Sequence, residues 1–158
     1  MDFPALCPTQ YVGWGLPFVA MALMTPEELD AFLAAAFPQA VLPYRVTRSD
    51  DDGVEIRQSF EEFFLRPGGT ISGPTLMTLA DTVAYVAIVA RIGPEFLTVT
   101  SHLSIDFLRK PPPAALRATG EVLKLGRRQA TVAVRIHSDH ADELVAFCTA
   151  TYAIPQPG

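Results

Sequence analysis

One carboxylate is the residue of this chain best suited to chemistry. Asp81 is the only charged residue between Arg66 and Arg91, in a segment that is mostly apolar. Because burying an unpaired charge costs free energy, a lone ionisable group in an apolar wall indicates a functional site. Its carboxylate can act as a general base or as a nucleophile. The alternative is a structural role, in which Asp81 bonds the hydroxyl of Thr78 or Thr82.

The second reactive feature is the loop Ser72-Gly73-Pro74, which opens the same apolar segment. Pro74 lacks an N–H and suits the first position of a helix, so the Gly73 amide is expected to point out of the helix N-terminus. Such an amide can donate to a carbonyl oxygen that gains negative charge. Asp81 lies about 10 Å further along the helix axis, at 1.5 Å per residue. One carbonyl group is too small to touch both, so we predict that two subunits share the site.

The elements that position these residues are an apolar helix over residues 75–91 and a set of strands. Gly93-Pro94 ends this helix, and its apolar residues on nearly every side indicate burial all round. A shorter helix begins at Thr25-Pro26, where threonine can cap and proline suits the first turn, and it stops at Pro38. The predicted strands are 41–47, 54–65, 96–108, 116–125, 128–137 and 144–154, with a turn over residues 49–53 joining the first two.

Strand 96–108 alternates in polarity, which assigns its side chains to two faces. One predicted face carries Thr98, Thr100, His102, Ser104 and Asp106, and the other carries Val99, Leu103, Ile105 and Phe107. Antiparallel strands with one long apolar helix predict an α+β fold, in which a curved sheet wraps around that helix.

Composition bounds the class of protein. The chain has 158 residues, a net charge of −5 and 49% hydrophobic residues, which excludes a disordered chain and argues against a nucleic-acid binder. We predict an N-terminal apolar arm and short helix over residues 1–39 and a single domain over residues 40–158. Prolines and glycines interrupt the uncharged stretch 3–26, so we expect no membrane span and a cytoplasmic protein. Cys7 and Cys148 are expected to be buried free thiols, and no metal site is predicted.

The motifs resemble those of a known family, the hotdog-fold acyl-CoA thioesterases of the phenylacetate-degradation (PaaI-like) type. That family has a His-Gly-Gly loop at the start of its central helix. Its catalytic aspartate follows nine residues after the histidine, in a Leu-Ala-Asp context. In this chain Ser72 occupies the histidine position, Gly73 and Pro74 the glycine positions, and Asp81 that of the catalytic acid.

The resemblance covers roughly residues 40–154 and implies a hotdog fold for the domain. It implies that Asp81 is the general base or nucleophile and that the Gly73 N–H is the oxyanion donor. Thr100 falls where the family has a serine or threonine at the reaction site, although strand propensity alone also explains a threonine there. The substrate-binding residues that we expect are Arg66, Ser72, Pro74, Arg127 and Arg128.

Arg66, Ser72 and Pro74 depart from the family pattern. Arg66 stands where the family often has an asparagine, and it is expected either to pair with Asp81 or to bind a phosphate of coenzyme A. Arg127 and Arg128 lie in a Gly-Arg turn that the family shares. They are candidates for the same phosphate contact, or residues of a solvated turn.

The expected reaction is hydrolysis of an aryl- or fatty-acyl-CoA, with coenzyme A as part of the substrate and without a separate cofactor. One alternative is a hotdog protein that binds an acyl-CoA or an aromatic ligand without cleaving it. Another is hydration or dehydration, which requires a histidine near the helix entrance. The histidines of this chain, His102, His137 and His140, all follow the helix instead.

The predicted assembly is a homodimer or a dimer of dimers. Strand 96–108 would invite uncontrolled pairing if it were an exposed edge. In the family that this chain resembles, the equivalent strand pairs with its two-fold mate. The uncharged arm over residues 3–24 is expected to cover the partner or the mouth of the pocket.

Overall fold

The computed structural model describes residues 24–40, 43–139 and 141–156. The helices are α1 (Pro26–Ala36), the short 3₁₀ helix η1 (Glu62–Phe64) and α2 (Gly73–Ile92). The strands are β1 (Tyr44–Asp50), β2 (Gly53–Gln58), β3 (Leu65–Arg66), β4 (Thr70–Ile71), β5 (Val99–Phe107), β6 (Leu116–Leu125), β7 (Gln129–Ser138) and β8 (Ala141–Ala153).

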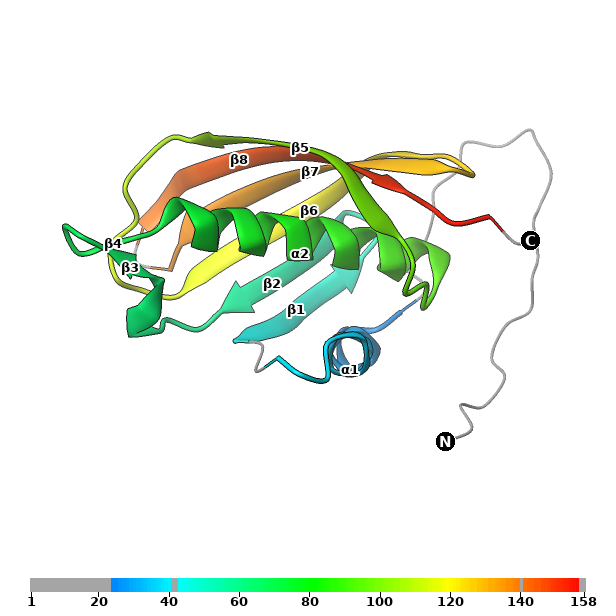
Figure 1. Ribbon diagram of the computed structural model, residues 1–158, viewed down its shortest axis with the longest axis horizontal. Coiled ribbons are helices and arrows are strands. Elements are labelled where there is room, and N and C mark those ends of the chain that lie inside the picture. Colours follow the sequence, from blue (N-terminus) through cyan, green and yellow to red (C-terminus); the bar gives the residue numbers. More distant parts are fainter. Residues whose placement is uncertain (1–23, 41–42, 140, 157–158) are drawn as a thin grey trace.

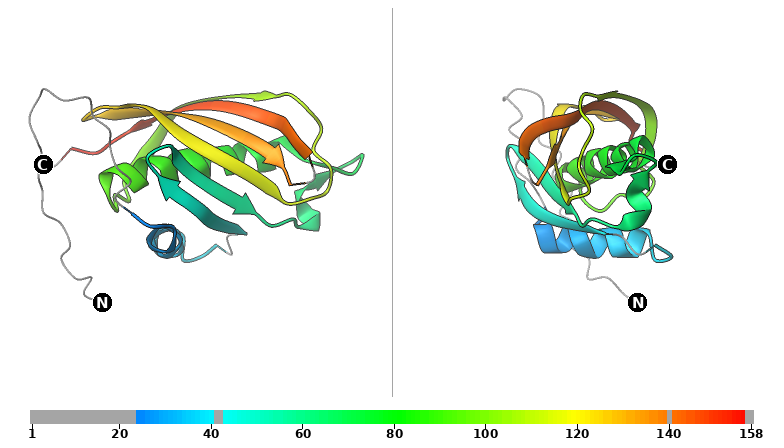
Figure 2. Two further views of the ribbon diagram at one scale, coloured as in Figure 1. Left: turned by 180° about the vertical axis from the view of Figure 1, so that it is seen from behind. Right: turned by 90° about the vertical axis from the view of Figure 1, so that its left-hand side faces the viewer.

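Six strands form one antiparallel sheet in the order β1-β2-β6-β7-β8-β5. The sheet runs along α2 and curves around it, which is clearest when the molecule is seen from its end (Figures 1 and 2). The predicted α+β fold, a curved antiparallel sheet around one long helix, is therefore confirmed.

Helix α2 forms the centre of the core. Its buried residues are Leu76, Leu79, Ala80, Val83, Ala84, Tyr85, Val86, Ala87, Ile88, Val89 and Ala90. Gly120 of β6 lets the sheet approach the helix closely, since a Cβ there would lie 2.8 Å from Val83 Cγ1. Within the described residues, α2 is the one helix long and apolar enough to cross a membrane, but most of it is buried inside the protein, as expected of a core helix.

Helix α1 begins as the sequence predicts. The Thr25 side chain accepts the Glu28 N–H and the Glu28 side chain accepts the Thr25 N–H, which is a capping box. Leu29, Phe32 and Leu33 then pack into the same core as α2, so the short helix and the sheet share one hydrophobic interior. The apolar arm over residues 3–24 lies, except for Met24, outside the described residues.

The predicted strand 54–65 is wrong in its second half. Strand β2 ends at Gln58, which pairs with Leu116, the first residue of β6. Beyond that point no strand of the described residues pairs with β2, and the chain turns into η1. The predicted loop over residues 66–74 also contains structure, because β3 and β4 form a short hairpin that turns at Gly68 and Gly69, both with positive φ.

Candidate active site

The loop before α2 builds a helix N-terminus. Ser72 is the N-cap, and its Oγ accepts the Thr75 N–H at 3.4 Å and lies 2.9 Å from the Thr75 hydroxyl. Gly73, rather than the predicted Pro74, is the first helical residue, because the capping serine starts the helix one residue earlier. The Gly73 N–H is consequently one of the first-turn donors that have no acceptor within the helix.

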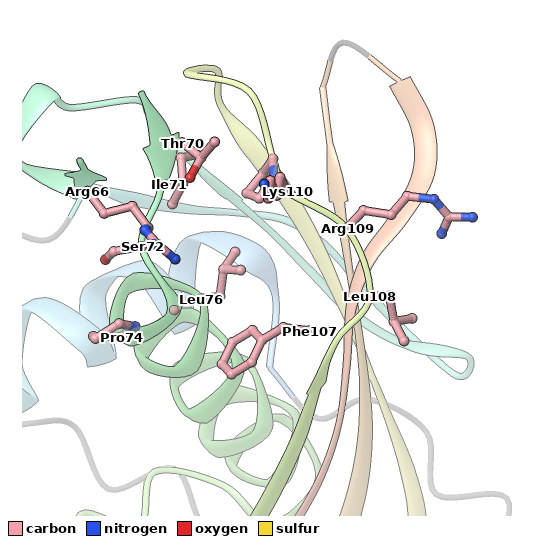
Figure 3. Close-up of a pocket in the computed structure, with 12 residues that line it drawn as sticks. Arg66, Thr70, Ile71, Ser72, Pro74, Leu76, Phe107, Leu108, Arg109 and Lys110 are labelled. Carbon is pink, nitrogen blue, oxygen red and sulfur yellow. The ribbon is translucent and has the colours of Figure 1, made fainter. Parts of the chain in front are cut away.

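A pocket of about 720 Å³ opens at this helix N-terminus (Figure 3). Its lining residues are Arg66, Thr70, Ile71, Ser72, Gly73, Pro74, Leu76, Phe107, Leu108, Arg109, Lys110 and Pro111. The structure thus brings four of the predicted site residues, Arg66, Ser72, Gly73 and Pro74, to one pocket. The Phe107 ring lies over the start of α2, where a Cβ on Gly73 would approach it to 3.4 Å.

The charged side chains of the pocket are all cationic. Figure 3 shows Arg109 turned away from the pocket, where it donates to the Leu144 carbonyl at 2.9 Å and lies 3.5 Å from the Glu143 carboxylate. Arg66 and Lys110 form no ion pair within the described part of the chain. Together with the positive end of α2, these two cations favour an anionic group in the pocket.

Asp81 lies half-buried on the third turn of α2. Its Oδ1 accepts two hydroxyl hydrogen bonds, from Thr100 at 2.8 Å and from Tyr152 at 2.6 Å. The predicted alternative, a bond to Thr78 or Thr82, is wrong. Both of those hydroxyls donate to backbone carbonyls one turn earlier on α2, each at 2.9 Å.

A β-bulge decides which face of β5 carries Thr100. The pairing of β5 with β8 shifts between Thr100 and His102, so Ser101 is an extra residue without a partner in the ladder. The extra residue places Thr100 on the helix-facing side together with Leu103 and Ile105. The predicted face, on which Thr100 accompanied His102, is therefore wrong, since simple alternation holds only in a regular strand.

Sequence reasoning missed Tyr152, which lies 71 positions after Asp81 and is only 2% exposed. Burial raises the pKa of its phenol far above the ordinary value, and the bond to Asp81 raises that pKa further. The Tyr152 hydroxyl is therefore a neutral donor at any physiological pH. No local motif marks this tyrosine, because tyrosine is common in β-strands and Tyr152 lies within a predicted strand.

Cys148 lies on β8 and is 1% exposed, as expected for a buried free thiol, whereas Cys7 lies outside the described residues. Burial, and then the charge of Asp81, raise the pKa of the Cys148 thiol to about 11. Since the thiolate is the reactive form, Cys148 is inert at neutral pH.

This raised pKa predicts a loss of stability in alkali. The unfolded thiol ionises near pH 9 and the folded one only near pH 11, so the stabilisation is complete below pH 9 and falls as pH rises towards 11. At about 1.4 kcal/mol per pKa unit, the loss is on the order of 2 kcal/mol. Urea unfolding at pH 8 and pH 10.5 measures it. The fall should be smaller by this amount in Cys148→Ala, and equal falls in both proteins would contradict the assignment.

Several predicted site residues do not meet within one chain. Asp81 is absent from the pocket lining, and within the described residues it forms no ion pair with Arg66. The turn that carries Arg127 and Arg128 joins β6 to β7 at the opposite end of the sheet from β3 and β4 (Figures 1 and 2). Neither His102 nor His137 forms a hydrogen bond or ion pair with Asp81 in the described structure, and His140 lies outside it.

Comparisons with known proteins agree with this architecture. Residues 68–145 match the sequence profile of the Thioesterase superfamily. A solved protein from Silicibacter sp. TM1040, described provisionally as a thioesterase, is 33% identical. The match covers 88% of this chain and 97% of that one, with a TM-score of 0.80. No curated protein sequence matches the chain.

Two more distant structures share the fold. Zebrafish thioesterase superfamily member 2 is 20% identical, over 84% of this chain and 99% of its own, with a TM-score of 0.73. A phenylacetic acid degradation-related protein from Ralstonia eutropha JMP134 is 23% identical, over 78% and 98%, with a TM-score of 0.67. Since this chain has the same fold as the Silicibacter protein, is 33% identical to it and covers 97% of it, the chain belongs to the thioesterase superfamily.

Proposed function

We propose that this protein hydrolyses acyl-CoA thioesters. Water adds to the thioester carbonyl carbon, the carbon–sulfur bond breaks, and the products are a carboxylic acid and the free thiol of coenzyme A. Asp81 acts either as the general base that takes a proton from the water or as the nucleophile that forms an anhydride, which water then opens. Superfamily membership supports thioester hydrolysis in general, and the site suggests which residues carry it.

The observation that carries the proposal is the setting of Asp81. In an otherwise uncharged stretch of core helix, its carboxylate is half-buried and held by the hydroxyls of Thr100 and Tyr152. Neutral hydroxyl donors stabilise a carboxylate without cancelling its charge. The two donors therefore hold the carboxylate in a fixed position, as a base or nucleophile requires.

The pocket supplies the other groups that the reaction requires: an oxyanion donor, an apolar wall and a cation. The Gly73 N–H donates to the oxyanion that forms on the thioester carbonyl. Ser72 and Pro74 shape the entrance, the Phe107 and Leu76 side chains offer an apolar wall, and Arg66 offers a cation for a coenzyme A phosphate.

The site is completed by a second subunit in this proposal. Strand β5 is an edge of the sheet, and Val99 and Phe107 on it are 58% and 51% exposed. Antiparallel pairing of two β5 strands would reverse the partner's helix, so that its Asp81 approaches the Gly73 of the first chain. The same reversal carries the partner's Arg127 and Arg128 towards the pocket. We therefore propose a homodimer, or a dimer of such dimers, in the cytoplasm.

A pair of Gly73 variants tests the oxyanion donor. Gly73→Pro removes the N–H yet keeps a φ that suits a first helical position, so kcat is expected to fall about 10²-fold to 10³-fold. Gly73→Ala keeps the N–H and adds a Cβ whose nearest neighbour, at the tip of the Phe107 ring, is 3.4 Å away, so it should stay within about 5-fold of wild type. Thiol release from a panel of aryl- and fatty-acyl-CoAs measures both.

Two outcomes would contradict this proposal. Equal rates for Gly73→Pro and Gly73→Ala would remove the amide from the mechanism. Tight binding of acyl-CoA by the wild-type protein in calorimetry, with the ester intact by mass spectrometry, would instead establish the non-hydrolytic binding protein.

A further inference from the structure

We infer that Tyr152 is a positioning residue for the reaction, and that it fixes which oxygen of Asp81 reacts. Tyr152, with Thr100, holds Oδ1, so that Oδ2 is the oxygen that meets water or the thioester carbon. This inference rests on the proposed role of Asp81 and adds an atom-specific assignment to it.

The hydrogen bonds around Asp81 are unevenly distributed between its two oxygens. Thr100 Oγ1 and the Tyr152 hydroxyl both donate to Oδ1, at 2.8 and 2.6 Å. Among the described residues no group donates to Oδ2. The uneven arrangement leaves one oxygen with its lone pairs free for chemistry.

The Tyr152 hydroxyl also bridges the Asp81 carboxylate and the backbone carbonyl of Asp81. This hydroxyl lies 2.8 Å from the Asp81 carbonyl oxygen as well as 2.6 Å from Oδ1. A single hydroxyl between these two oxygens restricts the Asp81 side chain to the rotamer that brings them to the same side. Thr100 lies on an edge strand and bonds only Oδ1, so by itself it does not impose this restriction.

The donor itself is rigid. Tyr152 is 2% exposed, and its ring stacks on that of Tyr85, with ring centres 6.3 Å apart and planes 24° apart. Tyr85 is itself buried, and its ring also packs against those of Phe32 and Phe37, with ring centres 5.8 and 6.3 Å away. A catalytic group is held accurately only when the residues that support it are themselves locked by packing.

Backbone pairing places the two donors opposite one another. Thr100 of β5 pairs with Tyr152 of β8, and residues directly opposite in a ladder project from the same face. The bulge at Ser101 is what turns Thr100 towards that face. Because of the bulge, the hydroxyls of Thr100 and Tyr152 both face Asp81.

The test compares two tyrosine-to-phenylalanine variants in the full-length protein. Tyr152→Phe keeps the ring stack and removes the donor, and it is expected to lower kcat by about 10-fold to 100-fold, with KM changed less than about 2-fold. Tyr85→Phe removes a hydroxyl from the same stack without touching Asp81, and it should stay within about 2-fold of wild type in both constants. Equal kcat values for the two variants would overturn the inference while leaving hydrolysis by the wild type intact.

A second measurement does not depend on activity. Three-bond NMR couplings about χ1 of Asp81 should report one rotamer in the wild type and in Tyr85→Phe, and averaged rotamers in Tyr152→Phe. Averaged couplings in the wild type would overturn the inference even if Tyr152→Phe did not fold. Absence of thioester hydrolysis by the wild type, with a single Asp81 rotamer, would refute the proposed reaction and leave the positioning by Tyr152 standing.

Discussion

Replacing Asp81 with asparagine is expected to lower the kcat of acyl-CoA hydrolysis by about 10³-fold, the range that a positioned base or nucleophile contributes. Asparagine keeps the shape of the side chain and an oxygen that can accept the Thr100 and Tyr152 hydroxyls, so the fold should persist. Asp52→Asn, in the exposed hairpin turn, removes the same charge away from the site and should leave kcat unchanged. Thiol release under saturating substrate measures all three proteins.

The same variant tests whether the site is shared between subunits. A heterodimer of Asp81→Asn and Gly73→Pro chains, isolated with two affinity tags, contains one intact site if Gly73 and Asp81 come from different chains. It should regain about half of the wild-type activity, because a two-fold dimer has two equivalent sites. An inactive heterodimer, or a stable active monomer in light scattering, would contradict the shared site.

Replacing Gly53 with alanine is expected to reduce the free energy of unfolding by more than about 3 kcal/mol. Gly53 has a φ of +129°, and a Cβ there would lie 2.1 Å from the backbone oxygen of Gly120. That oxygen cannot withdraw, since Gly120 pairs with Val54 and packs beneath Val83 of α2. The substitution forces apart β2 and β6, and the melting temperature should fall by on the order of 10 °C.

Gly68→Ala is the matched control for this effect. Gly68 also has a positive φ, of +101°, but a Cβ there meets nothing within 4 Å. The free energy of unfolding of Gly68→Ala should fall only by the cost of placing alanine in a left-handed backbone conformation, about 1–2 kcal/mol. Urea unfolding at one protein concentration measures both variants. If Gly53→Ala costs no more than Gly68→Ala, the close approach of β2 and β6 at Gly120 is not what requires glycine.

Local sequence signals predicted much of the fold. The start of α1 follows from a threonine cap with proline and two acids in the first turn, and all of these interactions lie within one turn of helix. The extent of α2 and the strands β6, β7 and β8 was predicted to within a few residues, because hydrophobic periodicity depends only on near neighbours. The end of β2 was not, because that end depends on where β6 begins.

The candidate site divides in the same way. Asp81 and the Gly73 loop could be singled out from the sequence, because a lone charge in an apolar segment and a glycine before a helix are local patterns. Which residues surround Asp81 could not. Alternation along β5 assigns Thr100 to the wrong face. A bulge is an extra residue in one of two paired strands, so its position depends on how β5 pairs with β8 and not on the sequence of β5 alone.

By itself, then, the sequence determined the two groups suited to chemistry and the elements that carry them. Only the tertiary structure decided that Asp81 accepts from Tyr152, and that Arg109 turns to Glu143 while Arg66 stays at the pocket. The physical reason is that helix and strand periodicities are short-range. The contact between Asp81 and Tyr152 joins residues 71 positions apart and depends on the register of β8 against the whole curved sheet.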